Sequence, residues 1–112
     1  MSAIKVTPTR EKREIRAEVI GAPDLPKTYT SLTIRPRSIH VSWTRQLHTG
    51  SSPEPWRVDT VVLYGPRVLK SGRLGESWSD VSMSYHRDRP GWLNDLLADM
   101  EPSNAGAREV TS

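Results

Sequence analysis

The spacing of apolar residues changes its period once along this chain, and that change constrains the fold more than any other feature. Before residue 86, apolar and polar residues alternate in several runs, as in strands that have one buried face. In PGWLNDLLADM, residues 90–100, apolar residues recur at i, i+3, i+4 and i+7, the spacing of an amphipathic helix. The sequence therefore predicts an α+β domain: an antiparallel β-meander of five to six strands with one C-terminal amphipathic helix packed on one face.

The clearest strand pattern is SIHVSWTRQL, where Ile39, Val41 and Trp43 fall on one face and His40 on the other. In WRVDTVVLY, the unbroken apolar run 61–63 predicts a central strand with both faces covered. We expect further strands where β-branched or alternating residues gather, and short strands on either side of a hairpin near residue 72. These further strands cover residues 13–21, 28–34 and 79–85.

The segment GPRVLKSGRLGES contains a Lys-Ser pair among glycines and invites comparison with a phosphate-binding loop. Such a loop needs a glycine directly before the lysine and a helix after the serine, but Leu69 precedes Lys70 and strand-like sequence follows. The spacing instead predicts a tight hairpin with a two-residue loop, Ser71-Gly72, and a bulge at Gly75, after a corner at Gly65-Pro66.

Length and composition limit the classes of protein to consider. The 112 residues suit one domain, which we place at residues 13–101, between a flexible N-terminal arm, 1–12, and a flexible tail, 102–112. There is no cysteine, so disulfides and thiolate chemistry are excluded. No apolar stretch resembles a signal peptide or a membrane span, and we expect a soluble cytoplasmic protein. The net charge is +3, with basic residues concentrated near the N-terminus.

Catalytic motifs fail on spacing. HRD, residues 86–88, also occurs in the catalytic loop of protein kinases, but this chain is too short for that domain, and we expect Asp88 to help cap the following helix. The three histidines stand too far apart to pair on one metal ion. His40 would act as a general base only if a carboxylate such as Asp59 lay beside it. We therefore expect neither an enzyme nor a bound cofactor or metal.

Arginine beside tryptophan is the pattern of a nucleic-acid surface, because bases stack on rings while arginine holds phosphate. Trp43 shares its face with core residues, whereas Trp56, at a strand start, fits either a core or an exposed position. The candidate binding residues are Trp56, Arg57, His40, Arg45, Arg35 and Arg37.

The motifs GPRVLKSGRLGES and RPGWLNDLLADMEPS carry a resemblance over the C-terminal half. This half resembles a group of small uncharacterised actinobacterial and actinophage proteins, in which a strand enters a G-x-R-x-L-K-S/D-G hairpin and the chain closes with P-x-W-L/I-x-x-L. The resemblance implies a similar fold and favours a phage or mobile-element origin. It assigns no activity and no functional residue.

From these observations we expect a small non-enzymatic binding protein that uses an exposed sheet face or the 48–57 loop against a protein partner or a second copy of itself. One alternative is a weak, sequence-independent nucleic-acid binder that uses the arginines of its strands. The other is a small enzyme with a site centred on His40.

Overall fold

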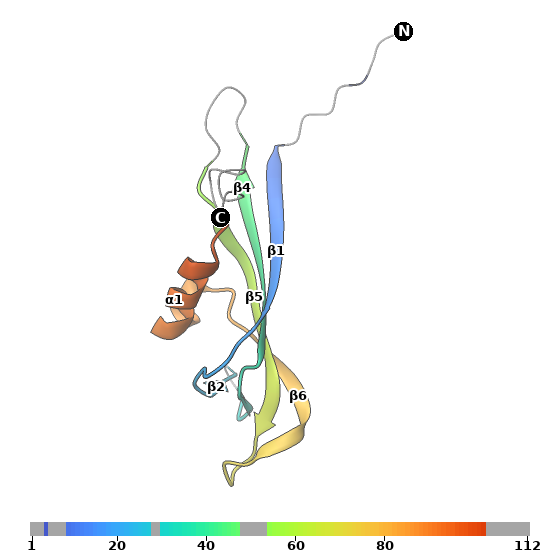
Figure 1. The fold of residues 1–112 in the computed structure, drawn as a ribbon, viewed down its shortest axis with the longest axis vertical. Helices are drawn as coiled ribbons and strands as arrows, with labels where there is room; N and C mark the ends of the chain where they lie inside the picture. Colours follow the sequence, from blue (N-terminus) through green and yellow to red (C-terminus); the bar gives the residue numbers. More distant parts are fainter. Residues whose placement is uncertain (1–3, 5–8, 28–29, 48–53, 103–112) are drawn as a thin grey trace.

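A computed structural model describes residue 4 and residues 9–27, 30–47 and 54–102, and within them it shows the predicted α+β fold (Figure 1). One antiparallel sheet contains six strands in this part of the chain, and helix α1, Gly91–Met100, follows the last strand. The strands are β1 (Arg10–Glu18), β2 (Leu25–Pro26), β3 (Thr33–Ile34), β4 (Ser38–Gln46), β5 (Arg57–Val68) and β6 (Leu74–Ser82).

The four long strands form the meander. β1 pairs with β4, β4 with β5, and β5 with β6, all antiparallel. The two short strands extend the sheet beside the far end of β5, where Ile34 pairs with Arg67. β5 is therefore central, while β1 and β6 each have one neighbour among the described strands.

Residues that pair across the strands share a face, so the register divides the sheet into two surfaces. One surface, the core face, carries Ile39, Val41 and Trp43 of β4 with Val61 and Leu63 of β5, all buried. The other surface, the open face, carries the alternate residues. The core face of β4 is the one that the alternation in SIHVSWTRQL predicts.

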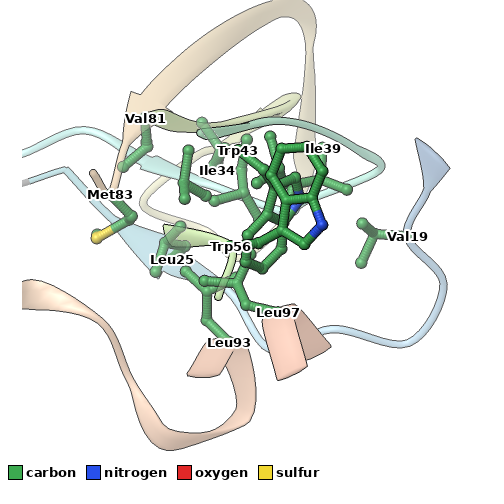
Figure 2. Packing of buried hydrophobic residues seen from close by; sticks show 13 residues of the cluster. Val19, Leu25, Ile34, Ile39, Trp43, Trp56, Val81, Met83, Leu93 and Leu97 are labelled. Atoms are coloured by element: carbon green, nitrogen blue, oxygen red, sulfur yellow. The ribbon is translucent and has the colours of Figure 1, made fainter. Parts of the chain in front are cut away.

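The core lies between this sheet surface and helix α1. Leu93 and Leu97 point from the helix into the cluster around Trp43 and Trp56 (Figure 2). Leu96 and Met100, on the same helical stripe, pack at its margin. The helical spacing thus predicts both the helix and its buried side.

The β5–β6 hairpin confirms a turn in place of a phosphate loop, but its loop has three residues. The Leu69 amide donates to the Arg73 carbonyl at 2.8 Å and the Gly72 amide to the Leu69 carbonyl at 2.8 Å, so Lys70, Ser71 and Gly72 form the loop. Gly72 has a φ of 87°, the left-handed conformation that closes three-residue hairpins. The pairing shifts register opposite Gly75, where the sequence predicts a bulge.

Three details of the predicted strands differ from the structure: where β1 begins, the shape of the chain at Gly65-Pro66, and how far β5 is covered. β1 begins at Arg10 and not at residue 13, so part of the expected arm belongs to the sheet. The Gly65-Pro66 step lies inside β5 and is not a corner, because β5 pairs with β6 through it. Val61 and Leu63 are buried on the core face, but Val62 on the open face is only half-buried, so the second face of this strand is not fully covered.

The start of the helix also differs from the prediction. Asp88 belongs to a short 3₁₀ turn, His86–Asp88, and Pro90 is the N-cap of α1 without a side-chain hydrogen bond. Arg89 holds this connection instead, because its guanidinium donates to the carbonyls of Met83 and Ser84 at 2.7 and 2.6 Å. Burial lowers the pKa of Arg89 below its usual value. None of the helices in the described ranges has the length and apolar character needed to cross a bilayer.

Candidate functional site

The open face of the sheet carries two exposed aromatic side chains on its central and outer strands. Trp78 of β6 is 58% exposed and Tyr64 of β5 is 37% exposed. Trp78 pairs with Pro66, and Tyr64 pairs with Asp80, so the two aromatic residues stand on adjacent strands and on the same surface. Large exposed aromatic side chains are the residues most enriched at binding hot spots. We define Trp78, Tyr64 and Asp80 as the open-face patch.

The sequence contains the signal for Trp78, although Trp78 is absent from the predicted site residues. In SWSDVSMSY, Val81 and Met83 alternate with Asp80 and Ser82, and Trp78 shares its spacing with the polar set. Val81 and Met83 are buried in the structure, which places Trp78 on the opposite surface of β6. The alternation in β6 alone therefore predicts that Trp78 lies on the face opposite the core.

Trp56, the predicted candidate for an exposed aromatic, is 4% exposed and belongs to the core, so the interpretation of it as a surface binding residue is wrong. The Arg45 guanidinium lies 4.3 Å from the centre of its ring, and that of Arg13 lies 5.4 Å away. Both arginines are on the core face, where Arg13 pairs with Trp43 and Arg45 with Glu11. They cover the indole ring from solvent and interact with its π electrons.

Arg45 is also held within the fold. Its side chain is 9% exposed, and its Nε and Nη2 both lie 2.6 Å from Oε1 of Glu11. Glu11 and Arg45 pair directly across β1 and β4, which explains why the sheet brings them together. A nearly buried, charge-paired guanidinium has little freedom to bind phosphate, so Arg45 has a structural role.

The other predicted arginines do not gather on one surface. Arg57 is exposed on the open face opposite Thr44, and it lines one pocket together with Arg10 and Arg45 at this end of the sheet. Arg35 and Arg37 lie at the other end of β4, and Arg35 Nε donates to Asp24 Oδ1 at 2.8 Å. The four predicted arginines are therefore divided between the two ends of β4 and form no continuous basic patch with one another, as a nucleic-acid surface would require.

The Arg35–Asp24 pair has a pH signature. The hydrogen bond from Arg35 lowers the pKa of Asp24, and the same bond raises the pKa of Arg35. A carboxyl whose folded pKa is depressed stabilises the fold above its unfolded pKa and loses that contribution as pH falls through the folded value.

We predict that Asp24→Asn slightly lowers the free energy of unfolding at neutral pH. The difference from the wild type should shrink in urea titrations as the pH falls below about 3.9, the usual pKa of an aspartate in an unfolded chain. A difference that stays constant as the pH falls further would contradict it.

His40 lies on the open face beside a carboxylate, but the carboxylate is not the expected one. Its Nε2 is 3.8 Å from Oε1 of Glu14 on the neighbouring strand, while Asp59 lies at the bulge where the β4–β5 register shifts. An open groove of about 490 Å³ runs beside it, lined in part by Arg16, Ser38 and Tyr64. A His40-centred enzyme stays a prediction, without the Asp59 partner.

The predicted binding loop 48–57 is described only from Glu54 onward, and residues 48–53 lie outside the described residues. In the described ranges, no three His, Cys, Asp or Glu residues gather as a metal ion would require. No family model, curated protein or solved structure matches the chain. The actinobacterial and actinophage resemblance stays a prediction.

Proposed function

We propose that this chain is a non-enzymatic binding protein whose open-face patch docks a protein partner. The observation that carries the proposal is the exposure of Trp78 at 58%, beside Tyr64, on the sheet surface opposite helix α1. An indole left in water at a rigid strand position gains most by being covered, because tryptophan buries a large apolar area with little loss of side-chain freedom.

The charges of the open face favour a protein over a nucleic acid. On β1 this surface alternates in sign through Lys12, Glu14, Arg16 and Glu18, and beside Trp78 it carries Asp80. A phosphate backbone requires a predominantly basic surface, whereas mixed charges around an aromatic centre are typical of protein interfaces. The partner should offer an apolar side chain to Trp78 and a basic one to Asp80. The proposal includes the phage or mobile-element origin that the resemblance favours.

The proposal is tested by affinity capture from the native host with a matched pair of variants. Trp78→Ala removes the exposed indole, and Tyr85→Ala removes a side chain that is 72% exposed but lies outside the strands. We expect at least one protein to be retained by the wild type and by Tyr85→Ala and lost with Trp78→Ala. The same protein, once purified, should bind with a Kd at least about tenfold weaker for Trp78→Ala.

Two outcomes would contradict this function. One is that Trp78→Ala and Tyr85→Ala retain the same amount of the captured protein, which would mean that Trp78 has no special role. The other is binding of single-stranded DNA or RNA oligonucleotides that weakens with salt and with Trp78→Ala, because bases stack on exposed aromatic side chains. That second result would assign the open face to nucleic acid.

A further inference from the structure

Within the part of the chain that the structure describes, strand β1 forms an outer edge of the sheet (Figure 1). At one end of β1 the Val19 amide donates to the Arg37 carbonyl, and at the other the Thr9 carbonyl accepts from the Leu47 amide. The β1–β4 register has no shift between these points, so the odd-numbered residues of β1 direct their backbone groups to β4. The even-numbered residues therefore direct their amides and carbonyls away from the sheet, toward the position that an added strand would occupy.

The side chains at these even-numbered positions alternate in charge. Lys12, Glu14, Arg16 and Glu18 are all exposed and all lie on the open face. Edge strands commonly carry charges of one sign, which repel a second copy in every register. Alternating signs instead pair opposite charges in some registers and like charges in the registers between them.

We propose that two copies of this chain pair through β1, antiparallel, about a two-fold axis at Ile15. In this register residue numbers that face each other add up to 30, so Lys12 of each copy faces Glu18 of the other, and Glu14 faces Arg16. These pairs fall on the positions with outward backbone groups, so each opposite-charge pair coincides with a hydrogen-bonded pair. The sheets of the two copies become continuous.

Neighbouring registers of the same parity place like charges together. An axis at Glu14 would put Glu14 opposite itself and Lys12 opposite Arg16, and an axis at Arg16 would put Arg16 opposite itself and Glu14 opposite Glu18. The period of two along a strand excludes odd shifts, because they would place residues of the two faces opposite each other. Axes at Arg13 and Ala17 would also pair opposite charges. Of these registers, only the one centred on Ile15 gives all four charged residues an oppositely charged partner, so the charges favour this register of a self-complementary two-fold interface.

The core face agrees with this pairing. An apolar groove between β1 and helix α1 includes Ala17 and Trp92, with Asp95 and Asp99 also in its lining. Across the two-fold axis, Arg13 of the second copy faces Ala17 on this same surface. The pairing thus places a basic residue opposite the β1 margin of a groove that two aspartates also line. Its guanidinium, which lies over Trp56 in its own copy, would have to turn from that ring to reach them. The dimer does not depend on the open-face patch, which lies on the strands beyond β4, so Trp78→Ala should leave it intact.

Charge exchange tests the proposal by sedimentation equilibrium of the full chain. We expect the wild type to dimerise, and Glu14→Arg or Arg16→Glu to weaken the dimer at least about tenfold, since the symmetry repeats each repulsion twice. The double variant Glu14→Arg/Arg16→Glu should recover the wild-type Kd. Glu76→Arg, which makes the same charge change on an exposed residue of β6, should have no effect. A wild type that stays monomeric to about 100 µM, or single variants that still dimerise like the wild type, would overturn the proposal.

A cysteine substitution reports the register independently. Ile15 faces itself at a non-hydrogen-bonded position, where Cα atoms stand about 4.5 Å apart, within the range of a disulfide. Because the natural chain has no cysteine, Ile15→Cys introduces the only thiol. It should oxidise to a covalent dimer much faster than Ala17→Cys. In the Ala17→Cys dimer, each cysteine faces Arg13 of the other copy, so the two thiols lie several residues apart along the strands. Equal rates for the two variants would refute the register centred on Ile15.

Discussion

Replacing Gly65 by alanine should destabilise this protein by about 3 kcal/mol, the upper end of the cost of overpacking. A Cβ atom at this position would lie 1.9 Å from the carbonyl oxygen of Arg35 and 2.7 Å from its carbonyl carbon. The segment cannot retreat easily, because the Arg35 and Arg37 amides donate to the carbonyls on either side of Gly65, those of Pro66 and Tyr64. Glycine is required here for close backbone approach.

Thermal unfolding followed by circular dichroism would show the effect as a Tm lower by roughly 12 °C or more. Gly91→Ala is the matched control, since an added Cβ there meets nothing within 4 Å, and alanine is the better helix former. We expect Gly91→Ala to leave the Tm unchanged or to raise it. Equal stability of Gly65→Ala and the wild type would show that β5 does not pass so close to Arg35.

Trp56→Ala should lower the free energy of unfolding by about 3–5 kcal/mol, although the sequence made Trp56 a candidate for binding. The substitution removes a ring that is 4% exposed and takes the aromatic face away from Arg45 and Arg13. Arg45 would keep Glu11 as its partner but lose its packing against the ring.

The comparison with Trp78→Ala separates structure from function, because the chemical change is identical. Trp78 is 58% exposed, so its removal should cost no more than about 1 kcal/mol in urea titrations. We expect Trp56→Ala to lose stability and Trp78→Ala to lose binding. If both variants unfolded at the same urea concentration, the assignment of Trp56 to the core and Trp78 to the surface would be wrong.

The period of the apolar residues predicts much of the fold. Alternation places Ile39, Val41 and Trp43 on the core side, and helical spacing places Leu93 and Leu97 in contact with it. These predictions succeed because a strand or helix with one apolar face has few ways to bury it. The position of the hairpin succeeds for a local reason, the positive φ that Gly72 can adopt.

The candidate site was less predictable, because it depends on contacts between distant segments. Glu11 and Arg45 are 34 residues apart and meet only through the β1–β4 register, which no local pattern fixes. The same register brings Glu14, and not Asp59, to His40. The burial of Trp56 depends on two arginines that cover its ring, while Trp78 could have been assigned to the polar face of β6 by alternation alone.

We propose that a protein partner docks on the open face at Trp78, and this proposal can be tested in the cell. It is tested most directly by placing a photo-crosslinking amino acid at position 82, an exposed open-face position of β6 that leaves Trp78 in place, and, separately, at position 85 of the full chain in its native host. We predict a discrete crosslinked protein from position 82, lost when excess wild-type chain competes but not when Trp78→Ala competes, and no such product from position 85. Crosslinks that are the same from both positions, or none from position 82, would contradict the proposal.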